Sequence, residues 1–202
     1  MDQFVQEDHY DGETHMEEKD SEKYLGDIIS SNAKNVKNIA SRKNKSIGIC
    51  RKIMTSLNDL WLGKFHFEAA ILLRNSLLIS SLLSNSEAWH NLTEVDLRNL
   101  EKADENLLAK ILDTPVTTPK EMLYLELGVT PIRFIIKSRR LNFLKYIMEE
   151  PKDSLVHQVL DAQFEQPTRN DWGQTILEDL KDVNLDINAV KNMTRKQFKT
   201  HI

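Results

Sequence analysis

Hydrophobic residues recur every three to four positions through most of the chain, which is the spacing of a helix with one apolar face. The stretch 64–84 is apolar on nearly all sides and predicts a central, buried helix. It contains Arg74 and Asn75 and its apolar run is too short for a membrane span. The segment from about 36 to 57 predicts an amphipathic helix, whose apolar stripe is Val36, Ile39, Ile47, Cys50, Met54 and Leu57.

Capping signals predict where the later helices begin and end. Thr93 and Asp96 have the spacing of a capping box. The Thr-Pro pairs at 118–119 and 130–131 predict two further starts with proline as the first helical residue, and Gly128 predicts the end of the first of these helices. Shorter helical patterns follow over 154–165, 171–182, 186–192 and 195–201.

The N-terminal part of the chain differs from the rest. Residues 1–22 are polar and acidic, and they predict a disordered tail because they bury too little apolar surface to offset chain entropy. The segment 23–30 (KYLGDIIS) has the composition of a short strand. The predicted fold class is therefore mainly α: a helical bundle with one short N-terminal β-strand, followed by further short helices.

Charge is distributed unevenly along the 202 residues, although the net charge is only −4. Residues 1–24 hold nine acidic and two basic residues, whereas residues 28–64 hold eight basic residues and one acidic residue. A concentrated basic segment predicts a polyanionic partner, and the alternative is an ordinary solvated helix face. The cations expected on the outer face of the helix over 36–57 and just before it are Lys34, Lys37, Arg42, Lys45 and Lys52.

Residues typical of catalysis and metal binding are few. The single cysteine, Cys50, excludes an intramolecular disulfide framework and a thiolate zinc site, and its position in the apolar stripe favours a core residue over a nucleophile. The six histidines are scattered, so neither a metal nor another cofactor is expected. No secretory signal precedes the helices, which predicts an intracellular protein of the nucleus or the cytoplasm, without contact with a membrane.

Two further groups have alternative interpretations. An acid–lysine set has a spacing found in nucleases, but such spacings are common on solvated helices; it comprises Asp171, Glu178, Asp179 and Lys181. An aromatic set is compatible with a platform for stacking bases, but its place around the most apolar helix favours core packing; it comprises Trp61, Phe65, Phe67 and Trp89.

A series of short strings gives the chain a family resemblance over about residues 16–165. In order and spacing, they resemble the region that follows the palm in reverse transcriptases of non-LTR (LINE-type, R2-like) retrotransposons. In that family, a YLG segment leads from the palm into the thumb. The strings are 23-KYLGDIIS-30, 87-EAWHNL-92, 100-LEKADENLLAKIL-112 and 119-PKEMLYLELGVTPIRFIIKSRRLNFLKYI-147.

The resemblance implies a domain organisation and a partner. After the tail of residues 1–22, residues 23–115 correspond to the last palm strand and a thumb-like bundle, and 116–165 to a helical linker. Beyond the resemblance, the helical patterns predict partly flexible short helices over 166–202. Because the thumb grips the primer–template, the implied partners are an RNA or RNA/DNA duplex and the missing palm and fingers. A second basic stripe joins the predicted interface or forms internal salt bridges; it consists of Arg133, Lys137 and Arg140.

The residues that carry polymerase chemistry are missing from this sequence. No F/Y-x-D-D string supplies the paired aspartates that two-metal chemistry requires, and no zinc knuckle or nuclease centre is found. We therefore expect a non-catalytic fragment of an RNA-directed DNA polymerase that binds nucleic acid through its basic helix face. The alternative is a helical protein-interaction module or an inert relic of a retroelement.

Overall fold

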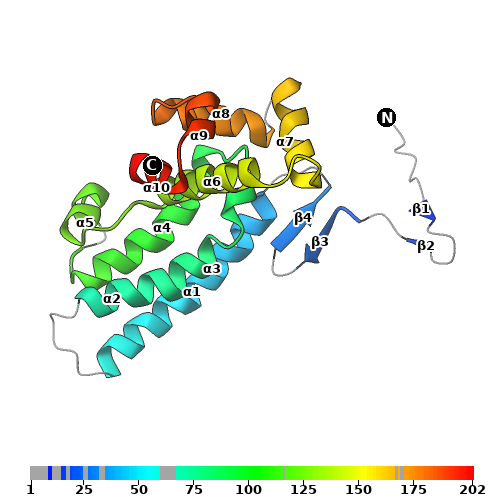
Figure 1. Ribbon diagram of the computed structural model, residues 1–202. Helices are drawn as coiled ribbons and strands as arrows, with labels where there is room; N and C mark the ends of the chain where they lie inside the picture. The colour runs from blue at the N-terminus through cyan, green and yellow to red at the C-terminus, as the bar shows by residue number, and fades with distance from the viewer. Residues whose placement is uncertain are drawn as a thin grey trace.

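The chain folds into a mainly helical structure, seen in a computed structural model (Figure 1). This confirms the predicted fold class. The structure describes residues 9–10, 15–16, 19–24, 27–31, 35–59, 67–115, 117–166, 168 and 171–202. Its helices are α1 (Val36–Asp59), α2 (Phe67–Leu73), the π-helix η1 (Arg74–Ile79), α3 (Ser80–Leu82), the 3-10 helix η2 (Ser86–Ala88), α4 (Glu94–Ile111), α5 (Lys120–Glu126), α6 (Ile132–Glu149), α7 (Leu155–Glu165), α8 (Trp172–Asp182), α9 (Ile187–Asn192) and α10 (Arg195–His201).

Strands occur near the N-terminus as two antiparallel pairs. Strand β1 (His9–Tyr10) pairs with β2 (His15–Met16), and β3 (Ser21–Tyr24) pairs with β4 (Asp27–Ser30). The expected single strand over 23–30 is thus part of a hairpin rather than one continuous strand. Only two residues, of which one is Gly26, separate β3 from β4, and this is the spacing of the commonest hairpins.

The first hydrophobic core lies between α1, the continuous helix formed by α2, η1 and α3, the helix α4, and the N-terminal half of α6. Ile39 and Ile53 of α1 pack here with Leu78 and Leu100. Leu108 and Leu123 belong to a smaller cluster that attaches α5 to α4. The helix over 67–82 is central as predicted, but its outer face is exposed at Leu72 and Leu77. None of the helices that the structure describes is long and apolar enough to cross a membrane.

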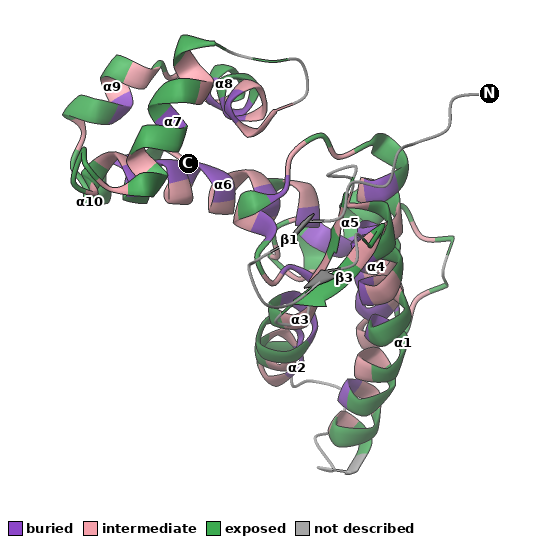
Figure 2. Ribbon diagram, turned by 90° about the vertical axis from the view of Figure 1, so that its right-hand side faces the viewer, coloured by how far each residue is buried: buried purple, intermediate pink, exposed green. Residues whose placement is uncertain are grey.

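The second core lies at the other end of α6. Leu141, Leu144 and Ile147 of α6 pack there with Ile176 of α8 and Phe198 of α10. Figure 2 shows α6 running from the group of α1–α5 to the group of α7–α10. Because α6 contributes to both cores, the helical segment 116–165 has no separate core among the described residues.

Helix ends follow the capping signals closely. Thr93 and Asp96 form the predicted capping box. Gly128 has a φ of 59° just after α5, and the Val129 N–H donates to the Tyr124 carbonyl in a Schellman-type ending. Pro119 and Pro131 precede α5 and α6 by one residue, so each is the N-cap and not the first helical residue.

A buried ion pair connects three parts of the first core. Arg74, at the start of η1, donates through Nε and Nη2 to both carboxylate oxygens of Asp104 on α4, each at 2.6 Å. Its Nη2 also donates to the Thr130 carbonyl just before α6, at 3.3 Å. Burial raises the pKa of Asp104, whereas Arg74 opposes this rise by stabilising the carboxylate. Such a pair tolerates the loss of one partner poorly, because the other charge remains buried and unpaired.

We therefore predict that Arg74→Met alone destabilises the fold by about 3–5 kcal/mol. The double variant Arg74→Met/Asp104→Leu should lose less, because no charge is left without a partner. Urea unfolding followed by circular dichroism measures both values and that of Asp104→Leu alone. If the double variant loses the sum of the two single losses, the pairing explanation is wrong.

Candidate nucleic-acid interface

Helix α1 carries the basic segment of the chain and contains no acidic residue before Asp59. Its buried side differs from the predicted apolar stripe. Val36 and Ile47 are 56% and 60% exposed, whereas the polar residues Asn38 and Arg42 are buried. The helix is therefore rotated about its axis relative to the prediction, and hydrogen bonds to polar groups account for the rotation.

Arg42 is the centre of this polar contact. Its guanidinium bonds Asp27 of β4, donates to the Ser81 carbonyl at 2.7 Å and lies 5.2 Å above the centre of the Trp89 ring. Asn38 and Asn85 also donate to Asp27. Arg42 was expected to contact nucleic acid, but the structure places it inside the protein, where it attaches the β3–β4 hairpin to the helices.

The solvent-facing side of α1 presents four cations: Lys37, Lys45, Arg51 and Lys52. None of them forms an ion pair with a described residue. Lys37 donates to the Ser21 hydroxyl at 3.0 Å. Lys34 lies outside the described residues, so its expected place on this face stays a prediction.

Gly48 lies in the middle of this cationic face. Lys45 precedes it by three residues, and Arg51 and Lys52 follow it by three and four, so all three are its neighbours on the helix surface. A Cβ built on Gly48 meets no atom of the described residues within 4 Å. The backbone of α1 is thus accessible from solvent between the cationic side chains. We call Lys37, Lys45, Arg51, Lys52 and Gly48 the α1 face.

Residues of the second basic stripe form salt bridges within the protein, which is the alternative that the sequence left open. Arg133 donates to both carboxylate oxygens of Glu101, at 2.6 and 3.0 Å, and this contact raises the pKa of the guanidinium. Lys137 bonds Asp182, and Arg140 donates to both oxygens of Asp179 at 2.7 and 2.9 Å. Since Lys137 and Arg140 connect α6 to α8, the stripe stabilises the second half of the molecule.

The acids of the acid–lysine set have separate structural roles. Asp171 caps α8 by accepting from the Gln174 N–H at 2.6 Å, Asp179 is buried against Arg140, and Glu178 accepts from the Gln174 side chain. Within the described parts of the chain, no group of three or more histidine, cysteine, aspartate or glutamate side chains is arranged to hold a metal ion.

Of the aromatic set and Cys50, Trp89 and Cys50 belong to the first core. Trp89 is buried, whereas Phe67 is partly exposed, and Trp61 and Phe65 lie outside the described residues. Cys50 packs against the core, and its thiol lies 3.7 Å from the Ala103 carbonyl oxygen. Burial raises the pKa of this thiol, which lowers the thiolate fraction and disfavours a nucleophilic role.

Sequence reasoning missed Arg51 on the α1 face. Its place there follows from the true orientation of the helix, which the apolar stripe did not give. Comparisons of the chain with protein-family models, with curated proteins and with solved structures find no significant match.

The contact of Asp27 with Arg42, between the β3–β4 hairpin and α1, should make the stability of the fold depend on pH. Partial burial raises the pKa of Asp27, but hydrogen bonds from Asn85, Arg42 and Asn38 outweigh it, and the pKa is lowered overall. A carboxylate whose pKa is lower in the folded state stabilises the fold above its unfolded pKa of about 3.9, and this stabilisation is lost as the pH falls through the folded value.

We predict that Asp27→Asn costs about 1–3 kcal/mol of stability at pH 7. The difference from the wild type should shrink as the pH falls below about 4, because the wild-type carboxyl then also becomes neutral. Urea unfolding at pH 7 and at lower pH tests this. A difference that stays constant with pH contradicts the assigned role of the Asp27 charge.

Proposed function

We propose that this chain is a nucleic-acid-binding helical module that uses the α1 face to hold a phosphate backbone. The observation that carries the proposal is the set of four exposed cations on one helix, without a carboxylate partner among the described residues. Long cationic side chains on one surface are the groups that contact phosphates, and such contacts position a protein without reading sequence.

The dimensions of the α1 face suit a duplex. From Lys37 to Lys52, the helix rises about 22 Å at 1.5 Å per residue. This length corresponds to about six or seven base-pair steps at 3.4 Å each. Four cations over this length permit about four phosphate contacts from one side of the duplex.

We further propose an RNA or RNA/DNA primer–template duplex as the partner, on the basis of the resemblance to the thumb and linker of non-LTR reverse transcriptases. The mainly helical fold is compatible with that origin. In this proposal the chain itself is non-catalytic, and the palm and fingers of such an enzyme act as separate partners. The proposed interface consists of the α1 face and Lys34, because Arg42, Arg133, Lys137 and Arg140 have carboxylate partners within the protein.

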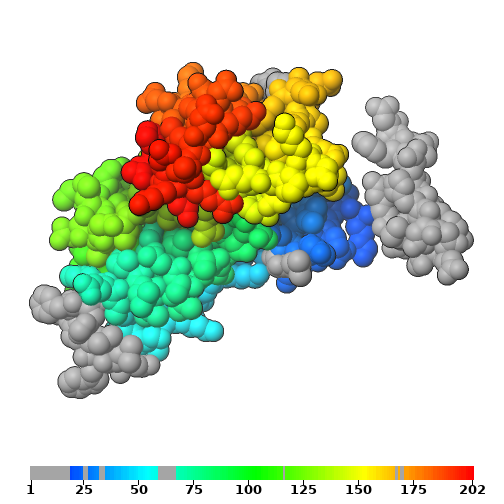
Figure 3. All heavy atoms as spheres, viewed as in Figure 1, coloured from blue at the N-terminus to red at the C-terminus, as the bar shows by residue number. Residues whose placement is uncertain are grey.

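The first test is the salt dependence of binding to a fluorescently labelled RNA/DNA duplex, measured by anisotropy. For about four neutralised phosphates, the affinity should fall roughly 150-fold between about 50 and 200 mM salt. The variant Lys45→Glu/Lys52→Glu should lose this binding. A matched control is Lys196→Glu/Lys199→Glu on α10, which makes the same change in net charge on a helix away from α1 (Figure 3). Equal losses in the two variants, or no binding by the wild type at low salt, would overturn the proposal.

A second test uses Gly48. Replacing Gly48 with alanine should stabilise α1 by up to about 1 kcal/mol, because glycine is a poor helix former and the added methyl group meets no protein atom. If the nucleic-acid backbone approaches α1 between its cations, the same substitution should weaken binding. A more stable protein with unchanged affinity would show that the duplex does not contact the helix backbone at this position.

A further inference from the structure

Helices α1 and α4 pack side by side and run in the same direction. Lys43 of α1 donates to the Asn99 side chain of α4 at 2.8 Å, and the Cys50 thiol lies 3.7 Å from the Ala103 carbonyl oxygen. Residues further along α1 therefore contact residues further along α4. The solvent-facing side of α4 next to these contacts is continuous with the surface that carries the α1 face.

A second row of polar and cationic residues follows this side of α4. Lys102 and Asn106 come three and seven residues after Asn99, and Lys110 comes four residues after Asn106, so all of them lie along one side of the helix. Lys102 and Lys110 are exposed, and neither forms an ion pair with a described residue. The charge of Lys110 opposes the rise in the pKa of the Cys50 thiol, which places this lysine near α1. We call Lys102, Asn106 and Lys110 the α4 row.

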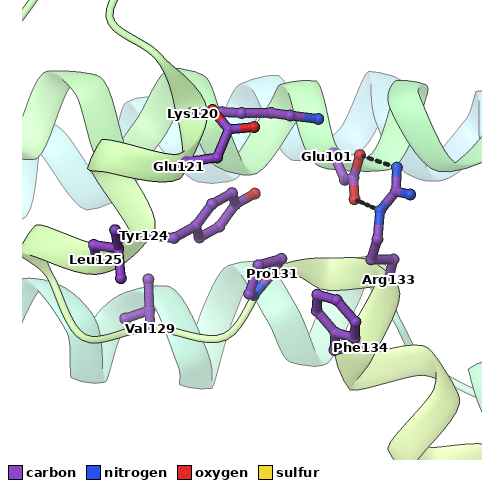
Figure 4. Close-up of a pocket in the computed structure, with 9 residues that line it drawn as sticks. All are labelled: Glu101, Lys120, Glu121, Tyr124, Leu125, Val129, Pro131, Arg133 and Phe134. Atoms are coloured by element: carbon purple, nitrogen blue, oxygen red, sulfur yellow. Dashed lines mark hydrogen bonds and ion pairs between the residues drawn. The ribbon is translucent and has the colours of Figure 1, made fainter. Parts of the chain in front are cut away.

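The acidic residues of α4 are engaged on other sides of the helix; they are Glu94, Asp96, Glu101, Asp104 and Glu105. Arg133 bonds Glu94 and Glu101, and Figure 4 shows its pair with Glu101 at a pocket of about 500 Å³ between α5 and α6, the α5–α6 pocket. Arg74 bonds Asp104 in the first core, and Asp96 closes the capping box. The charge of Lys120 on α5 acts on Glu105. The α4 row thus continues the cationic character of the α1 face.

The chemistry of this combined surface fits two phosphate backbones better than a single strand. Neither α1 nor α4 contains an aromatic residue, whereas proteins that hold single strands stack bases on aromatic side chains. The axes of packed helices lie about 8–10 Å apart, which falls within the range of roughly 6–12 Å for the widths of the grooves between two backbones. Two parallel rows of cations at this separation can each follow one backbone of a duplex.

We propose that the α4 row holds the second backbone of a duplex whose first backbone lies on the α1 face. Lys102 and Lys110 contact two phosphates, and the Asn106 side chain donates to the sugar–phosphate backbone between them. A single strand occupies only one of the two rows, so the α4 row makes the site selective for double-stranded nucleic acid. This inference rests on the proposed function of the α1 face.

The experiment compares one labelled strand, alone and annealed to its complement, in anisotropy titrations with the full chain. With about six phosphate contacts, duplex affinity should fall roughly 1,800-fold between about 50 and 200 mM salt, against roughly 150-fold for the α1 face alone. Lys102→Gln/Lys110→Gln should reduce the fall to the smaller value and weaken duplex binding at low salt. Its affinity for the single strand should stay unchanged. Glutamine is used because a glutamate there would attract the cations of α1.

Two control variants separate this inference from the proposed function. Lys196→Gln/Lys199→Gln on α10 removes the same net charge and should leave both affinities unchanged. Lys45→Gln/Lys52→Gln on α1 should weaken binding of the duplex and of the single strand alike, since both use the α1 face. Circular dichroism of each variant verifies that the fold is intact before affinities are compared.

The inference is wrong if Lys102→Gln/Lys110→Gln binds the duplex as the wild type does, or if it loses affinity for the duplex and the single strand equally. Equal losses in this variant and in the α10 control also contradict it. In each of these cases, a specific loss in Lys45→Gln/Lys52→Gln leaves the proposed function of the α1 face intact. If the wild type binds neither nucleic acid at low salt, both proposals fail.

Discussion

The buried pair of Arg74 and Asp104 is the contact on which the arrangement of the first core depends. It connects η1 to α4 and, through the Thr130 carbonyl, to the start of α6. A charged pair without solvent exposure is stable only when nearly all of its hydrogen-bonding groups are satisfied, so it permits few relative positions of these three elements. Arg74 occurs where the helix widens from α2 into the π-helix η1, and π-helical turns are often found where a side chain has a specific task.

Three buried arginines of this chain bond carboxylates, and most cations of the α1 face are exposed lysines, although Lys145 is a buried lysine that donates to the Val190 carbonyl. Arg42, Arg74 and Arg140 bond carboxylates inside the protein. The α1 face contains mostly lysines. This division has a physical reason, because the planar guanidinium bonds a carboxylate with two parallel N–H groups, while the strongly hydrated ammonium of lysine is better kept in water. A buried arginine is therefore a structural element here, whereas an exposed lysine on a helix without acids is available to a partner.

Capping residues and hydrophobic periodicity predicted most of the helices. The features that they did not predict depend on pairs of residues that are far apart in the sequence. The helices from α7 to α10 begin at the expected residue or one residue later, because each is preceded by a capping residue that acts within its own turn. The orientation of α1 was wrong because Arg42 pairs with Asp27, which lies in a different element. Likewise, Arg140 pairs with Asp179, 39 residues away, and no periodicity reveals such a partner.

The α1 face and the α5–α6 pocket differ in chemistry, but both are held in place by the same helix, α4. Helix α4 packs against α1 on one side, where Lys43 donates to Asn99, and against α5 through the Leu108–Leu123 cluster. Asp104 lies on α4 between these contacts and is also close to the Tyr124 hydroxyl. A substitution that breaks the Arg74–Asp104 pair therefore disturbs both surfaces through α4. Loss of binding in such a variant says nothing about the surface that binds, and only substitutions of exposed residues such as Lys45 and Lys102 separate recognition from folding.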